Sequence, residues 1–149
     1  MTPERHPPGP AGGLTLAAAQ SAVSAVITEA ARRGVGIAVA VAAPSGDLLA
    51  LARMDGVPPL AGESATRKCR TVALTWRSTA SFAKSLRDDL QSEPEYFHGM
   101  HHVGPLMTIG GGVPVLIDGR FAGAVAVSGA STPDDVALAE LGASVAARD

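Results

Sequence analysis

The segment from Gly110 to Asp135 constrains the fold more than any other part of the chain. Its sequence is GGGVPVLIDGRFAGAVAVSGASTPDD. Val113 to Ile117 is an apolar run rich in β-branched residues, Asp118-Gly119 is a dipeptide typical of a tight hairpin turn, and Phe121 to Ser128 returns as a second strand that contains glycine. Ser131 or Thr132 can then cap a helix whose first turn holds Pro133 and two carboxylates. The segment therefore predicts a β-hairpin followed directly by a helix.

The remaining sequence predicts a second hairpin and further helices. Apolar residues from Leu16 onward recur at i, i+3 and i+4, and Arg32-Arg33-Gly34 is typical of a helix end. We predict a helix over 16–33, a central strand over 36–43, a paired strand over 48–53, a helical region over about 62–90 with a possible break near Ser78, an irregular segment over 91–106 and a closing helix over 133–147. This order predicts a single α+β domain with a mostly antiparallel sheet.

Composition limits what this domain can be. With 149 residues and 3% aromatic residues, the chain needs an aliphatic, alanine-rich core in which helices approach the sheet closely. A net charge of −2 argues against nucleic acid as a partner, and no stretch reaches the ~20 apolar residues of a membrane span. The single Cys69 excludes an internal disulfide framework and favours a cytoplasmic location. Residues 1–13, rich in Pro and Gly, are expected to be a disordered tail before a domain over 14–149.

Four motifs resemble the GlcG/HbpS family, which includes the C-terminal domain of PduO-type proteins. They are RMDGV at 53–57, RKCRTVA at 67–73, GGGVPVLIDG at 110–119 and GAVAVSG at 123–129, and the resemblance covers about residues 14–147. It implies a profilin-like domain, an antiparallel sheet flanked by helices, that assembles into dimers, tetramers or octamers. It also implies an association with haem or, in some members, with cobalamin-related tetrapyrroles. Other members have no settled biochemical role.

Three of the four histidines lie together in the HGMHH stretch. If the stretch is helical, His98 and His102 share one face at i and i+4, a spacing that can ligate a metal or a haem iron, and His101 lies beside them as a candidate ligand-binding residue. A zinc site needs at least three protein ligands, and the spacing fixes no companion carboxylate here. The alternatives are a polar surface loop with incidental histidines, or acid–base catalysis by His98 or His102.

Lys68 lies at the border of the apolar face of the helix predicted after residue 62. A lysine there can bury its stem and direct its ammonium into a pocket, where desolvation lowers its pKa and permits a base or imine role. It can also bind an anion such as a haem propionate or a substrate carboxylate, or simply extend to solvent. The neighbouring Cys69 is expected to be an inert core thiol.

Other candidates lie at strand ends and in glycine-rich backbone. Arg53 and Asp55 follow a strand, where binding groups are often mounted, although a local ion pair is an equal alternative. The amides of Gly110, Gly111 and Gly112 can face an anion or oxyanion, or the glycines can allow close backbone packing. Two further groups lie on helices. Arg67, Arg70 and Arg77 are expected to form a solvated or inter-subunit face, with an anion site as the alternative. Asp134 and Asp135 are expected to cap a helix, with support of a functional site as the alternative.

Three functions are consistent with these residues. The first is an oligomeric protein that binds haem or a related tetrapyrrole. The second is a cofactor-free proton-transfer enzyme (an isomerase, lyase, hydratase or cyclase) in which Lys68, one histidine of 98–102 and the Gly110–Gly112 amides act on a small metabolite. The third is a non-catalytic module that binds a partner. We favour small-molecule binding, with a cavity between Lys68 and residues 110–112.

Overall fold

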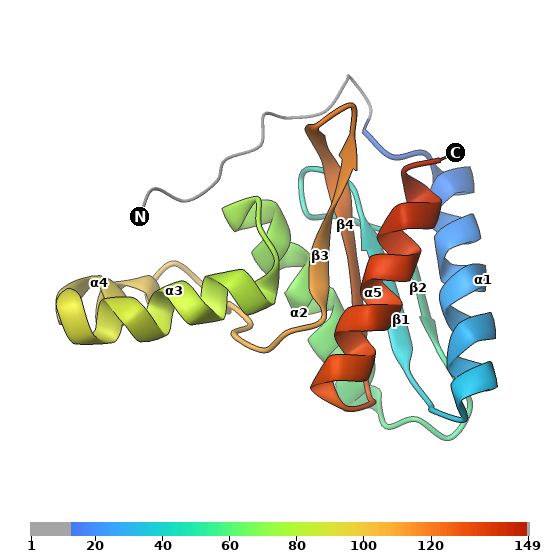
Figure 1. The fold of residues 1–149 in the computed structure, drawn as a ribbon, viewed down its shortest axis with the longest axis horizontal. Coiled ribbons are helices and arrows are strands. Elements are labelled where there is room, and N and C mark those ends of the chain that lie inside the picture. Colours follow the sequence, from blue (N-terminus) through green and yellow to red (C-terminus); the bar gives the residue numbers. More distant parts are fainter. Residues whose placement is uncertain (1–12, 149) are drawn as a thin grey trace.

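One antiparallel sheet organises residues 13–148, the part of the chain that the computed structural model describes. The elements follow in the order α1 (Leu16–Arg33), β1 (Ala38–Ala42), β2 (Leu48–Arg53), α2 (Pro59–Thr75), α3 (Thr79–Ser92), α4 (Pro94–Met100), β3 (Gly112–Ile117), β4 (Arg120–Ser128) and α5 (Thr132–Ala146). The four strands pair in the order β2-β1-β4-β3, so the two hairpins meet through β1 and β4 (Figure 1). This confirms the predicted α+β class.

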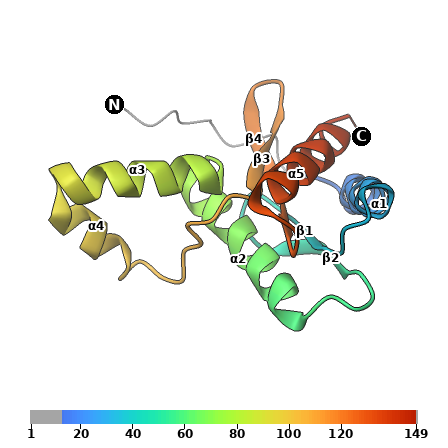
Figure 2. The same ribbon diagram turned by 60° about the horizontal axis from the view of Figure 1, so that its bottom comes forward.

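The two faces of the sheet differ in side-chain size. Side chains alternate between the faces along a strand, and the central strands place valines on one side and alanines on the other. The valine face packs against α1 and α5, and the alanine face against α2 (Figure 2). The residues on the two faces are Val39, Val41, Val125 and Val127, and Ala38, Ala40, Ala42, Ala124 and Ala126. The predicted aliphatic core is confirmed, and the alanines let the backbone of α2 approach the sheet.

Local signals fixed most element ends. The first helix is bounded as predicted: Thr15 Oγ1 accepts the N–H of Ala18 at 3.1 Å, and Gly34 ends the helix with a φ of 70°. The β3–β4 turn has positive φ at both Asp118 and Gly119, as the hairpin prediction requires. Strands and helices elsewhere begin or end within about three residues of their predicted bounds.

The predicted break near Ser78 is confirmed, and the irregular segment over 91–106 is corrected in part. The α2 helix ends because Trp76 adopts a left-handed conformation with φ of 58°, and Ser78 then caps α3 by accepting the N–H of Ser81. The segment after α3 contains α4, which begins with Pro94 at a position that tolerates proline. This helix was not predicted because Gly99 weakens the helical signal of the segment.

Helices α3 and α4 form an arm that projects away from the sheet in both ribbon views (Figures 1 and 2).

The expected N-terminal tail lies outside the described residues except for Gly13. Between residues 13 and 148, no helix is both long enough and apolar enough to cross a membrane.

Candidate functional site

Lys68 is buried and held by two partners from distant parts of the chain. Its side chain is 1% exposed, and Nζ donates a hydrogen bond to the carbonyl oxygen of Val127 at 2.9 Å. Nζ also lies 3.7 Å from Oδ2 of Asp135 in the first turn of α5. The ammonium therefore joins α2 to the end of β4 and to the start of α5, rather than extending to solvent.

Burial moves both members of this pair toward their neutral forms. Desolvation lowers the pKa of Lys68, and the attraction of Asp135 opposes that shift. Desolvation likewise raises the pKa of Asp135, against the hydrogen bond that its Oδ1 accepts from the N–H of Ala130 at 3.0 Å. Each charge depends on the other for compensation, because water does not reach either one freely.

The structure brings the glycine segment against Lys68, as the sequence analysis expected, but protein atoms fill the space between them. A Cβ added to Gly111, whose φ is 127°, would lie 2.7 Å from Lys68 Nζ and 2.6 Å from the oxygen of Val127. The N–H of Gly112 donates to Oγ1 of Thr79 at 3.0 Å. A Cβ added to Gly110 would lie 3.1 Å from the side chains of Thr132 and Val136. In this arrangement the absence of side chains at the glycines allows the backbone of residues 110–112 to pack closely against Lys68.

The other candidate residues lie away from this pair. Arg53 ends the edge strand β2, and Asp55 follows it; both are exposed, with Arg53 two strands from β4, about 10 Å across the sheet. The histidines lie on α4 and in the turn after it, on the arm that projects away from the sheet (Figure 1). Lys68 and a histidine of 98–102 therefore do not share one site within a single copy, as the proton-transfer hypothesis requires.

All three histidines are exposed, and two of them pack on the same ring. His98 and His101 meet Phe97 edge-on, with ring centroids 5.3 and 5.1 Å apart. Within residues 13–148, no group of three or more His, Cys, Asp or Glu side chains is placed to hold a metal ion. A haem iron is a different case, because the macrocycle supplies four ligands and the protein need supply only one or two.

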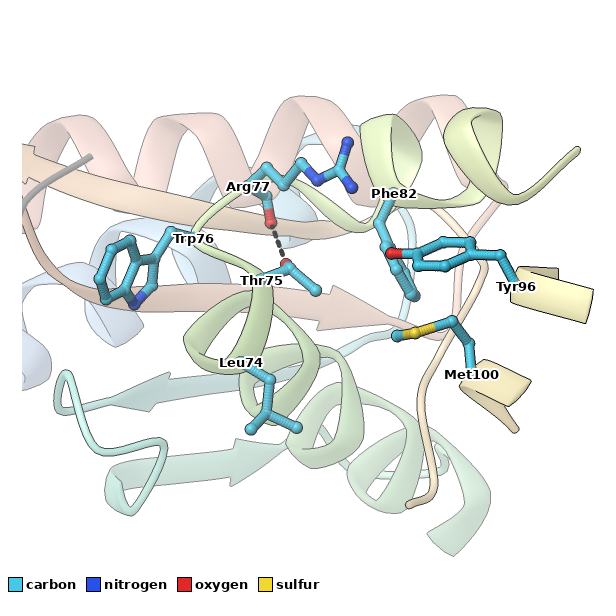
Figure 3. Close-up of a pocket in the computed structure, with 7 residues that line it drawn as sticks. All are labelled: Leu74, Thr75, Trp76, Arg77, Phe82, Tyr96 and Met100. Carbon is cyan, nitrogen blue, oxygen red and sulfur yellow. Dashed lines mark hydrogen bonds between the residues drawn. The ribbon is translucent and has the colours of Figure 1, made fainter. Parts of the chain in front are cut away.

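The sequence analysis missed a pocket where the arm joins the body. This elbow pocket has a volume of about 310 Å³ and is lined by Leu74, Thr75, Trp76, Arg77, Phe82, Tyr96 and Met100 (Figure 3). Figure 3 places the side chains of Phe82, Tyr96 and Met100 together on one side of Thr75, with Trp76 on the other. A signal was present: four of the five aromatic residues in the chain lie between residues 76 and 97.

The turn between α2 and α3 shapes the elbow pocket. Left-handed backbone at a residue other than glycine costs about 1–2 kcal/mol, and here it allows Trp76 to contact the ring of Phe121 at 6.3 Å between centroids. Thr75 Oγ1 donates to the carbonyl of Thr71 at 2.8 Å and lies 3.3 Å from the carbonyl oxygen of Arg77, which fixes the reversal. The strained turn therefore separates α3 from α2 and leaves the hollow between them.

The fold and this site define a class: an antiparallel-sheet α+β domain with a helical arm, exposed arm histidines and an aromatic-lined hollow at the arm's base. A family model described as "Haem degrading protein HbpS-like" matches residues 14–144. The chain therefore belongs to the HbpS-like family, as its motifs predicted.

Individual relatives agree with this assignment. The chain is 34% identical over 116 residues to protein GlcG of Escherichia coli K12, covering 77% of this chain and 81% of that one. The crystal structure of a double mutant of HbpS from Streptomyces reticuli superposes with a TM-score of 0.77 at 30% identity, covering 97% of each chain. The crystal structure of a PduOC:haem complex has a TM-score of 0.75 at 23% identity, covering 89% and 94% of the two chains, which supports the fold.

Proposed function

We propose that this protein binds haem or a related tetrapyrrole through the arm. One observation carries the proposal: α4 and the turn after it bear three exposed histidines, and α4 also contributes Tyr96 and Met100 to the elbow pocket. Imidazole is a common axial ligand of haem iron, and aromatic rings with a guanidinium nearby suit a flat macrocycle that carries propionates. The description of the family and the haem bound in the PduOC crystal structure favour the same ligand.

His98, His101 and His102 are the residues that we propose to ligate the iron. They lie within five positions of one another, and each is accessible from outside without rearranging the core. When bound, haem would supply an iron centre with visible absorbance. The protein's own groups would orient the macrocycle, with imidazole on the metal and the lining of the elbow pocket against one edge of the ring.

A haemin titration followed at the Soret band tests this function. We expect a saturable shift at micromolar haemin, lost or displaced in at least one of the variants His98→Ala, His101→Ala and His102→Ala. The matched control is His6→Ala, which removes the one histidine outside this stretch. Absence of a shift in the wild type, or an unchanged shift in the variant that lacks all three arm histidines, would contradict the proposal.

We also propose that the protein self-associates and acts in the cytoplasm. Helix α3 and the segment after α4 expose the apolar side chains of Leu90, Val103 and Ile109, and α4 packs mainly on α3. A second copy would bury such side chains. The sole cysteine is a buried free thiol whose pKa burial raises to about 12, consistent with a reducing compartment. Light scattering that gives the mass of a single copy at micromolar concentration would contradict the assembly.

A further inference from the structure

Arg77 carries a charge that no acidic side chain in residues 13–148 neutralises by an ion pair. Nη1 of its guanidinium donates to Oγ of Ser85 at 2.7 Å. Its Nε is buried and has no hydrogen-bond partner among the described residues. Because Nε and Nη2 form one edge of the guanidinium fork, Arg77 keeps the two-donor edge that suits a carboxylate, while Ser85 holds the opposite side.

The surroundings of Arg77 are apolar and fix its position. The guanidinium carbon lies 5.7 Å from the ring centroid of Phe82, a cation–π distance, and Phe82 is almost fully buried. The same ring lines the elbow pocket together with Tyr96 and Met100 (Figure 3). A fixed cation beside aromatic walls favours a ligand with a flat apolar part and an anionic end.

The volume limits the size of that ligand. At about 310 Å³ the elbow pocket is at the lower end of the range of about 300–1,000 Å³ for small-molecule sites. One aromatic ring with a short acidic side chain fits such a volume, whereas a complete tetrapyrrole would enter only by an edge.

We propose that the elbow pocket is a binding site for a small aromatic carboxylate. The ring of the ligand packs against Phe82 and Tyr96, and its carboxylate accepts hydrogen bonds from the free edge of Arg77. This binding needs no iron and no histidine, so it goes beyond the proposed haem function and can be tested separately.

The test uses 3-phenylpropionate as the probe and 3-phenylpropanamide as its neutral counterpart. Trp76 is the single tryptophan and lines the pocket, so its fluorescence reports on this site, and calorimetry gives the stoichiometry. We expect saturable binding of the acid to the full-length wild type, and binding of the amide at least about tenfold weaker, because a charge-assisted bidentate contact is lost.

Variants assign the contact to Arg77. We expect Arg77→Gln to weaken binding of the acid about tenfold or more and to remove the preference for acid over amide. The matched control is Arg87→Gln, an exposed arginine on α3 that does not line the pocket, for which affinity should stay within about twofold. Circular dichroism verifies that the variants fold, and the comparison of acid with amide on the wild type stands even if Arg77→Gln does not.

Each result decides one proposal. Equal affinity of the acid and the amide, unchanged affinity in Arg77→Gln, or no saturable response of the wild type overturns the carboxylate site. A Soret shift with haemin alongside any of these results leaves the haem function standing. Binding of phenylpropionate without a haemin response overturns the haem function and supports the carboxylate site.

Discussion

The buried pair of Lys68 and Asp135 should contribute far more to stability than an exposed pair of the same residue types. Replacing Asp135 by Asn keeps an oxygen that can accept from Ala130 but removes the anion 3.7 Å from Lys68 Nζ. At an effective dielectric constant near 20, two unit charges at that distance attract by about 4 kcal/mol. Because both side chains are at least nine-tenths buried, solvent screens little of this attraction.

We therefore expect Asp135→Asn to lower the free energy of unfolding at pH 7 by about 3–5 kcal/mol, the usual cost of leaving a buried charge unpaired. The double variant Lys68→Met with Asp135→Asn removes both charges, and its loss should be smaller than the sum of the two single losses by at least about 2 kcal/mol. What loss remains reflects the Val127 carbonyl, which is left without its donor from Lys68.

Urea unfolding followed by circular dichroism measures these energies, at one fixed protein concentration because self-association would add to apparent stability. The matched control is the exposed pair of Lys84 and Asp88 on α3, whose Nζ to Oδ2 distance is shorter, at 3.1 Å. The same double-variant cycle there should give at most about 0.5 kcal/mol. A coupling energy for Lys68 and Asp135 no larger than that of the exposed pair would refute the argument from burial.

Two further predictions concern the C-terminal end of α1 and the glycines. Arg32 and Arg33 donate hydrogen bonds to Glu29 and lower the pKa of its carboxyl group to about 2. The stability that this cluster contributes is therefore present above pH 4.5 and is lost as the pH falls toward 2. The melting temperatures of the wild type and of Glu29→Gln, measured against pH, should differ at neutral pH and converge at the acid end. Gly111→Ala should lower the free energy of unfolding in urea by about 2 kcal/mol or more, because the added Cβ would lie below 3 Å from other atoms and the residue has positive φ. Gly62→Ala, which lies on a helix with open space around it, should raise the free energy of unfolding by about 0.5–1 kcal/mol. Equal effects of the two substitutions would contradict the packing argument.

The arm shows where sequence reasoning works and where it weakens. The end of α2 was predicted because Ser78 is a recognisable helix cap, and α3 follows from it. The short helix α4 was not predicted, because Gly99 and three histidines give little helical signal, and seven residues are too few for periodicity to decide. The direction of the arm depends on the left-handed backbone of Trp76, a conformation that sequence patterns rarely indicate outside glycine and asparagine.

Lys68 shows the same limit at the level of one side chain. The periodicity of α2 places it at the border of the apolar face, which is compatible with an ammonium in solvent, in a pocket or in an ion pair. What excludes solvent is Asp135, 67 positions later, together with the backbone at Gly111. Neither neighbour could be assigned to Lys68 from spacing along one helix.

The sequence by itself determined the elements: period-two valine and alanine patterns made the central strands, Asp118-Gly119 made the hairpin turn, and Thr15, Gly34 and Ser131 placed helix ends. These are short-range effects, in which a residue and its near neighbours set the backbone. Only the tertiary structure decided that Lys68 is sealed in an ion pair and that the elbow pocket forms beside Arg77. Both depend on contacts between segments far apart in the chain, whose free energy no local pattern records.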